Sequence, residues 1–258
     1  MSAVIVFLSI CFVGCSAVTA VPPLTRQTKI IGGNVAVINQ YPSTVALIFS
    51  SDGNNYIQAC VGTILTTKSI VTAAHCLQGD VLSKWRARVG SSWANSGGTL
   101  YILSSMLIHP NFNLRTMDSD IAIVRPASSI TYSNVVKPAS IASANYNLMD
   151  GQIVWAVGFG SAAAGNSEQL RHLPIWTINQ STCALRYGLL GSNVTSNMLC
   201  AGLTTSSSGQ CVGDSGGPLL HNGNIVGVYS WGFSCASSVY PGVNTRISRF
   251  TTWLQQNA

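Results

Sequence analysis

From Ile30 to the C-terminus, the sequence is a succession of short apolar runs separated by glycine, asparagine, serine and proline. Runs of this kind lie at 45–49, 62–65, 69–72, 121–124, 153–157, 225–229 and 242–245. Strands this short, with turn residues this frequent, are typical of all-β barrels and sandwiches. Only the segment 249–256 has helical spacing, in Phe250, Trp253 and Leu254, with Ser248 as a candidate cap. We therefore predict an all-β fold that ends in a helix.

The N-terminal segment differs in kind from the rest of the 258 residues. A short apolar stretch, 4–13, leads to small residues that end at Ala20, which is typical of a cleaved signal peptide and too short for a membrane span. The polar segment 21–29 ends in Lys29 and resembles a propeptide with a basic cleavage site. We expect a signal peptide at 1–20, a propeptide at 21–29 and one secreted domain at 30–258, with no membrane attachment.

Charge argues against some classes of partner. Lys and Arg number 13 against 7 Asp and Glu, and charged residues make up 8% of the chain. The basic residues are scattered singly, so that no run forms a nucleic-acid or membrane patch. We predict neither nucleic-acid nor membrane binding.

The cysteines indicate an oxidising compartment. Two of the eight lie in the predicted signal peptide, which leaves an even number in the secreted chain. Six cysteines predict three disulfides, and the sequence by itself leaves their connectivity open. Without a Cys-x-x-Cys pair a zinc site is not expected, and we predict no metal and no cofactor. The six are Cys60, Cys76, Cys183, Cys200, Cys211 and Cys235.

Four short segments contain residue types that suit catalysis. They are Gly-Asp-Ser-Gly-Gly-Pro at 213–218, Val-Thr-Ala-Ala-His-Cys at 71–76, Asp-Ser-Asp-Ile-Ala-Ile-Val at 118–124, and Ile-Ile-Gly-Gly at 30–33. Taken singly, each has a structural interpretation as a turn, a buried histidine or a strand end. Their coincidence in one chain is what points to chemistry.

The segments together predict nucleophilic catalysis by serine. A serine hydroxyl is a weak nucleophile until a base removes its proton. His75 is the expected base for Ser215, and Asp120 is expected to fix the tautomer of His75 and to stabilise its charged form. Backbone N–H groups of Gly213 and Ser215 are expected to form an oxyanion hole. The order His, Asp, Ser is that of one class of serine peptidase.

Over 30–258 the chain resembles the chymotrypsin-fold serine proteases, and most closely the alkaline digestive trypsins of moth and butterfly larvae. The stretches that carry the second likeness are Val-Gly-Ser-Ser-Trp-Ala-Asn-Ser-Gly-Gly at 89–98, Ala-Asn-Tyr-Asn-Leu at 144–148 and Ser-Glu-Gln-Leu-Arg-His at 167–172. The resemblance implies two six-stranded antiparallel barrels with the catalytic residues between them. It also implies disulfides between Cys60 and Cys76, Cys183 and Cys200, and Cys211 and Cys235.

The same resemblance implies a zymogen. Cleavage after Lys29 by an activating protease would free the α-amino group of Ile30, which would pair with Asp214 and order the oxyanion loop. It further implies a monomer that acts on protein and peptide substrates and meets protein protease inhibitors, in a gut lumen if the enzyme is digestive.

One position departs from the trypsin pattern. Trypsins carry an aspartate six residues before the nucleophile, at the base of the pocket for the substrate side chain, where this chain has Gly209. From 169 to the C-terminus the only acid is Asp214. A buried substrate Arg or Lys would lack a counter-ion, so we do not expect cleavage after basic residues.

The expected walls of that pocket leave the size of the substrate side chain open. Glycines at two wall positions leave an uncharged slot that favours a large apolar side chain, while Gln210 beside the base would suit a smaller or mixed preference. The expected pocket residues are Gly209, Gln210, Ser230, Trp231, Gly232 and Gly242.

Two other functions share most of these features. A non-catalytic homologue would have the fold without the reaction, although such proteins typically lose a triad member. A non-digestive protease with a defined protein target would share all of the chemistry.

Segment 90–109 has no Asp or Glu, which argues against a calcium site there.

Overall fold

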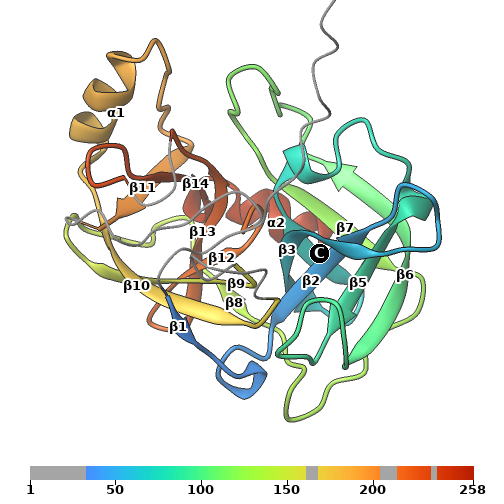
Figure 1. Cartoon of the computed structure of the whole chain (residues 1–258). Helices are drawn as coiled ribbons and strands as arrows, with labels where there is room; N and C mark the ends of the chain where they lie inside the picture. Colours follow the sequence, from blue (N-terminus) through green and yellow to red (C-terminus); the bar gives the residue numbers. More distant parts are fainter. Residues whose placement is uncertain (1–32, 161–167, 204–213, 234–236) are drawn as a thin grey trace, which may run out of the picture.

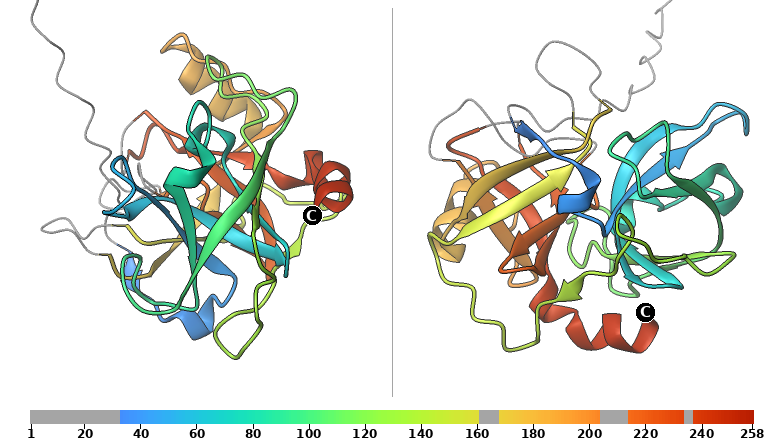
Figure 2. Two further views of the ribbon diagram at one scale, coloured as in Figure 1. Left: turned by 90° about the vertical axis from the view of Figure 1, so that its right-hand side faces the viewer. Right: turned by 90° about the horizontal axis from the view of Figure 1, so that it is seen from below.

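The chain folds into two β-barrels that stand side by side, the first coloured blue to green and the second yellow to red in Figure 1. The structure is a computed structural model that describes residues 33–160, 168–203, 214–233 and 237–258. Figure 2 separates the barrels in the view from below and shows the C-terminal helix beneath them. The predicted all-β fold of two six-stranded barrels with a C-terminal helix is confirmed.

The first barrel closes in the order β2-β3-β4-β7-β6-β5, and every pairing is antiparallel. Its strands are β2 (Thr44–Phe49), β3 (Ile57–Thr66), β4 (Ser69–Thr72), β5 (Trp85–Val89), β6 (Thr99–Ile108) and β7 (Ala122–Pro126). In β5 every second residue is buried, as expected for a strand with one face toward a core. Trp85, the first residue of β5, is fully buried in that core.

The second barrel closes in the order β9-β12-β13-β14-β11-β10, because β10 also pairs with β9. Its strands are β9 (Ile153–Gly158), β10 (Arg171–Thr177), β11 (Met198–Gly202), β12 (Pro218–His221), β13 (Asn224–Trp231) and β14 (Gly242–Arg246). Two short strands attach to its outside: β1 (Asn34–Val35) pairs with β10, and β8 (Ser140–Ile141) pairs with β13.

Helices occupy few of the described residues. The α-helices are α1 (Gln180–Gly188) and α2 (Thr251–Asn257), and the 3-10 turns are Ile38–Gln40, Ala74–Cys76, Leu82–Lys84 and Ile247–Arg249. Helix α2 follows the last strand of the second barrel yet docks on the first, where Arg125 of β7 donates a 2.6 Å hydrogen bond to the carbonyl of Asn257. The C-terminus thereby ties the two barrels together. No helix among the described residues has the length and apolar content needed to cross a membrane.

The structure corrects two expectations about helices. Ser248 is not a cap: it lies inside the 3-10 turn Ile247–Arg249, and α2 starts after Phe250 without a side-chain cap. Helix α1 was not predicted, because its short sequence buries only Cys183 and Tyr187 and so has little apolar periodicity. Its start is fixed instead by Asn179, whose side chain accepts a hydrogen bond from the backbone N–H of Thr182.

Candidate active site

The junction of the barrels holds a histidine and a buried aspartate from the first barrel. His75 lies in the 3-10 turn Ala74–Cys76, which follows β4, and Asp120 lies two residues before β7. The Nδ1 atom of His75 is 2.7 Å from Oδ2 of Asp120, and the backbone N–H of His75 donates to Oδ1 at 2.8 Å. Asp120 is fully buried, whereas the His75 side chain is 21% exposed. Strands β4 and β7 pair directly, which brings these two residues together.

The second barrel supplies the remaining partners of Asp120. The hydroxyl of Ser230, in β13, donates to Oδ2 at 2.5 Å, and the hydroxyl of Thr245, in β14, donates to the backbone carbonyl at 2.7 Å. A carboxylate only accepts, so the hydrogen between the ring and Asp120 is on Nδ1 of His75. Nε2 is therefore the ring nitrogen that can take up a proton. The pair thus has the chemistry of a general base held in one tautomer.

The neighbouring acid in the same segment has a different role. Asp118 accepts hydrogen bonds from the side chains of Thr195 and Asn197 in the second barrel, the latter at 3.1 Å to Oδ2. Of the two aspartates in 118–124, only Asp120 faces His75.

Ser215 lies in the turn before β12 and rests against the wall of the first barrel. Its carbonyl accepts from the backbone N–H of Val61 at 2.8 Å and lies 3.7 Å from Sγ of Cys76, the residue after His75. Gly216 adopts φ +82°, and a β-carbon there would overlap Thr72 and Val61. A glycine is required at this contact because the backbone has a positive φ and the barrel wall leaves no room.

Several predicted site residues lie outside the described residues. They are Ile30, Gly209, Gln210 and Gly213, with Cys211 and Cys235 of the third predicted disulfide. The predicted partner of Ile30, Asp214, is described and is 1% exposed.

The predicted pocket walls Trp231 and Gly232 follow Tyr229 and Ser230 at the end of β13. The ring of Trp231 packs on that of Tyr187 of helix α1, with centroids 4.7 Å apart. The hydroxyl of Tyr187 donates to the carbonyl of Pro241 at 2.6 Å, and burial raises its pKa to about 12. Gly242 opens β14 and lies opposite: a β-carbon on Gly232 would be 3.8 Å from its Cα. The structure thus brings Trp231, Gly232 and Gly242 together.

Sequence reasoning missed the further role of Ser230 and the presence of Tyr187 and Tyr229 at this wall. Ser230 was placed in the pocket wall, but its side chain points to Asp120. Alternation along 225–231 is the signal that indicates it, because neighbouring residues of a strand face opposite sides. Nothing in the sequence near 187 indicates contact with β13.

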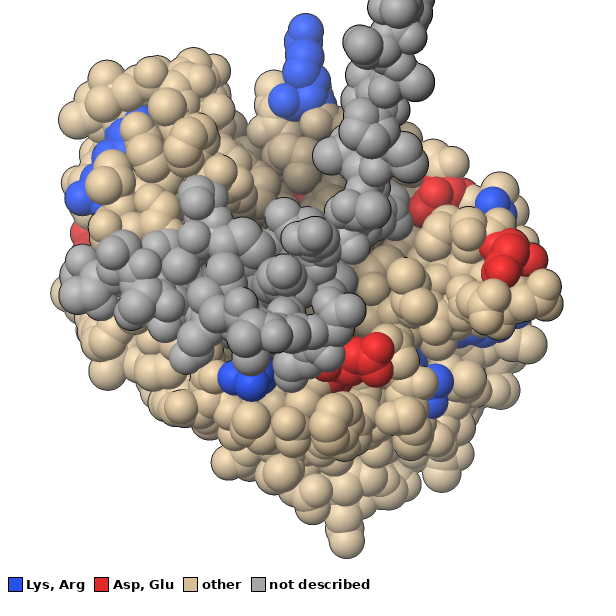
Figure 3. Space-filling model, in the orientation of Figure 1, with Lys and Arg blue, Asp and Glu red and all other residues tan. Residues whose placement is uncertain are grey.

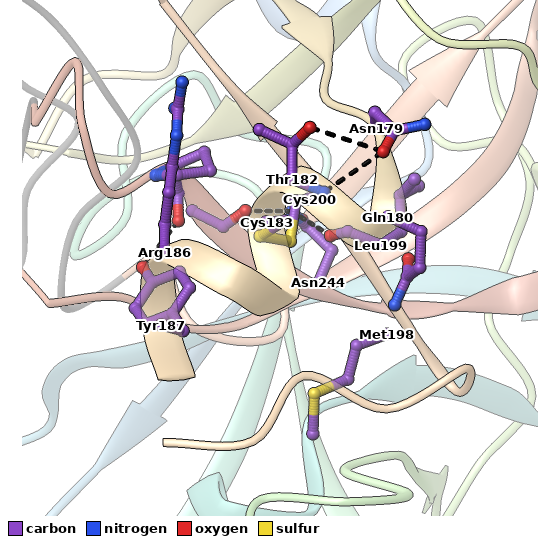
Figure 4. The surroundings of a disulfide bond; sticks show 12 residues. Asn179, Gln180, Thr182, Cys183, Arg186, Tyr187, Met198, Leu199, Cys200 and Asn244 are labelled. Carbon is purple, nitrogen blue, oxygen red and sulfur yellow. Dashed lines mark hydrogen bonds between the residues drawn. A yellow bond between two sulfur atoms is a disulfide. The ribbon is translucent and has the colours of Figure 1, made fainter. Parts of the chain in front are cut away.

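Two of the three predicted disulfides are confirmed, Cys60–Cys76 and Cys183–Cys200. Cys60–Cys76 joins β3 to the turn that carries His75. Cys183–Cys200 joins α1 to β11, and Figure 4 shows it between the capped end of the helix and the strand. Each bond lies beside an element of the site.

On the face shown in Figure 3, the described basic side chains lie apart among uncharged residues and a few carboxylates. Among the residues that the structure describes, no group of three or more His, Cys, Asp or Glu side chains could hold a metal ion.

Two antiparallel six-stranded barrels that meet at a buried aspartate–histidine pair define a class of protein, the serine endopeptidases of chymotrypsin fold. The chain belongs to the trypsin family, whose sequence model matches residues 30–254. It is 52% identical to "Trypsin, alkaline C" of Manduca sexta, over 98% of this chain and 99% of the relative. "Trypsin CFT-1" of Choristoneura fumiferana is 54% identical, over 94% of this chain and 95% of the relative. The "Vitellin-degrading protease" of Bombyx mori is 34% identical, over 97% and 94%.

Proposed function

We propose that the chain is a secreted digestive endopeptidase that cleaves peptide bonds through Ser215, His75 and Asp120. The observation that carries the proposal is the buried carboxylate of Asp120, bound by Nδ1 of His75 at 2.7 Å and by Ser230 Oγ at 2.5 Å. This arrangement supports a base at Nε2 of His75, on the barrel wall against which Ser215 rests.

In the proposed reaction, Oγ of Ser215 attacks the carbonyl carbon of the substrate while Nε2 of His75 takes the hydroxyl proton. The N–H groups of Gly213 and Ser215 stabilise the resulting oxyanion. The C–N bond then breaks, and the departing amine takes the proton from Nε2. Water, deprotonated by the same nitrogen, hydrolyses the acyl-enzyme and restores Ser215.

We propose that the protein is made with a signal peptide at 1–20 and a propeptide at 21–29, and that cleavage after Lys29 activates it. The new α-ammonium of Ile30 would pair with Asp214 and order the oxyanion loop. The deep burial of Asp214 supports this, because a positively charged partner offsets the cost of burying a carboxylate. The activating protease and protein inhibitors are the expected partners besides substrate.

We propose that the residue before the cleaved bond, called P1, is uncharged. Gly209 stands where trypsins have a pocket aspartate, and Asp214 is the only acid from 169 to the C-terminus. A buried substrate ammonium or guanidinium would find no carboxylate free to pair with it.

The decisive test is to label and assay the activated protein. The full-length chain is secreted, activated by a protease that cuts after Lys29, and treated with a fluorophosphonate probe that reacts with activated serines. We expect stoichiometric labelling of Ser215, none in Ser215→Ala, and cleavage of denatured protein by the wild type alone. Absence of labelling in a correctly processed protein would favour the non-catalytic homologue.

A digest of a peptide library, with the cleaved bonds identified by mass spectrometry, tests the P1 proposal. We expect few cleavages after Arg or Lys. Dominant cleavage after basic residues would contradict the argument from Gly209.

A second candidate function is proteolysis of one defined protein. The similarity to a relative named for degrading vitellin favours it. The two candidates differ in where the protein is made: expression in larval gut supports digestion, and expression confined to eggs supports the alternative.

A further inference from the structure

A tyrosine hydroxyl lies beside Gly232, one of the two glycines in the predicted wall of the P1 pocket. Tyr229 of β13 is 4% exposed and directly precedes the wall residues 230–232. A β-carbon on Gly232 would lie 3.3 Å from the Tyr229 hydroxyl and 3.8 Å from Cα of Gly242. The phenol therefore reaches the space that Gly232 leaves free on the side that faces Gly242.

The backbone of Tyr229 is fixed beside the nucleophile turn. Its N–H donates to the carbonyl of Gly217 at 2.9 Å, and its carbonyl accepts from the N–H of Gly216 at 2.8 Å. Both partners belong to the turn that follows Ser215, at positions 216 and 217. Because these two hydrogen bonds hold β13 to the turn, a shift of β13 at Tyr229 would disturb it.

The hydroxyl of Tyr229 is neutral. Burial and the nearby charge of Asp214 raise its pKa well above the ordinary value. No described residue makes a hydrogen bond with it, whereas the adjacent hydroxyl of Tyr187 is engaged by Pro241 and Phe233. A buried hydroxyl is usually hydrogen-bonded, and a substrate side chain or a water molecule can be one of its partners.

We propose that Tyr229 is a specificity-determining residue that fills part of the P1 pocket and restricts it to small, uncharged side chains. This inference rests on the proposed function. A phenyl ring from substrate and the phenol of Tyr229 cannot share one close-packed slot, because overpacking forces side chains and backbone out of place. Alanine, serine and threonine fit beside the phenol, and the two hydroxylated side chains can also hydrogen-bond its hydroxyl. Of the two preferences left open by the sequence, the smaller one is favoured.

The test compares peptides that differ only at P1, with Ala, Ser, Leu or Phe, using activated full-length enzyme. We expect the wild type to have a higher kcat/KM for Ala and Ser than for Phe. Tyr229→Val should raise the Phe/Ala ratio of kcat/KM at least tenfold, since a single pocket contact commonly changes selectivity by about 10–200-fold. Tyr229→Phe keeps the ring, so it should keep the preference for Ala over Phe and lose selectivity for Ser.

Tyr101→Val is the matched control. Tyr101 is also nearly buried, at 8% exposed, but lies in β6 of the first barrel, where its hydroxyl accepts from the N–H of Thr131. The substitution removes the same atoms and should leave the Phe/Ala ratio unchanged. A change as large as that in Tyr229→Val would show that general loosening alters specificity, and would overturn the proposal.

The fluorophosphonate label separates this inference from the proposed function. If the wild type is not labelled, the proposed function is wrong. If the wild type is labelled but prefers Phe over Ala, only the role of Tyr229 is wrong. The wild-type comparison of Phe with Ala does not depend on whether Tyr229→Val folds. An unchanged Phe/Ala ratio in a folded, labelled Tyr229→Val variant has the same consequence.

Discussion

The carboxylate of Asp214 packs against the α-carbon of Gly158, so closely that a β-carbon at 158 would overlap Oδ1. Gly158 ends β9, and Asp214 directly precedes Ser215.

Gly158→Ala should lower the free energy of unfolding by about 1–3 kcal/mol, because the added methyl group overpacks this contact. Displacement of Asp214 should also misplace Ser215 and reduce kcat by about 10²-fold. Denaturant unfolding and peptide hydrolysis measure the two effects.

Gly188→Ala is the control for this change. Gly188 ends helix α1, and a β-carbon built there meets no described atom within 4 Å outside its chain neighbours and the nearby helix backbone. It should leave stability and kcat close to those of the wild type. Normal kcat in Gly158→Ala would mean that Asp214 tolerates displacement and does not position Ser215.

Asp120→Asn is expected to preserve the fold and remove most of the activity. The amide can donate a hydrogen bond, which favours the tautomer of His75 with its hydrogen on Nε2, where no proton can be accepted. A loss in kcat of about 10⁴-fold is the magnitude known for this substitution in the enzyme class, not one obtained from this structure. Asp150→Asn, at an exposed carboxylate that binds Asn179, should retain wild-type kcat. A loss of less than tenfold in Asp120→Asn would argue against the assigned base.

The strands could be predicted because their information is local. The segment 69–72 was predicted as a strand and is β4, and 121–124 overlaps β7. These strands are short apolar runs with turn residues on both sides, so their sequences are sufficient. Helix α1 could not be found in this way, since most of its residues are exposed and its helical state depends on the cap at Asn179 and the disulfide of Cys183.

The residues of the site likewise fall into two groups, those that the sequence by itself predicts and those that depend on the fold. Ser215, His75 and Asp120 lie in distinctive segments, so the sequence singles them out before any fold is known. The role of Ser230 at Asp120 and the position of Tyr229 depend on contacts between segments far apart in the chain. The glycines at 232 and 242 suggested an open slot, because a sequence does not show which neighbouring side chain enters the space that a glycine leaves.

Removal of either described disulfide should destabilise the protein by about 3 kcal/mol, because the loops closed are similar, with sequence separations of 16 and 17. Paired substitutions to alanine avoid a free thiol. Cys60→Ala/Cys76→Ala should in addition lower kcat, since Cys76 follows His75 and its sulfur contacts the carbonyl of Ser215. Cys183→Ala/Cys200→Ala should leave kcat nearly unchanged where the protein stays folded. Urea unfolding and kcat measurement test this, and equal kcat losses in both variants would contradict it.

Strong alkali should destabilise the fold through Tyr187. Burial raises the pKa of Tyr187 from 10.0 to about 12. Between these values the unfolded chain loses the phenolic proton while the folded protein keeps it, so the unfolded state binds fewer protons and stability falls as the pH rises. The stabilisation is complete below pH 10 and is lost on the way to pH 12. Its size is at most about 3 kcal/mol.

Tyr187→Phe isolates this contribution, because phenylalanine does not titrate. The variant loses the hydrogen bond to Pro241 and should be the less stable protein at pH 8. Its disadvantage should shrink between pH 10 and pH 12, since only the wild type loses the contribution of Tyr187 there. Tyr132→Phe, at a residue that is 41% exposed, is the control and should alter the pH dependence less. Urea unfolding at pH 8, 10, 11 and 12 gives the comparison, and a constant stability difference across that range would refute the proposed linkage.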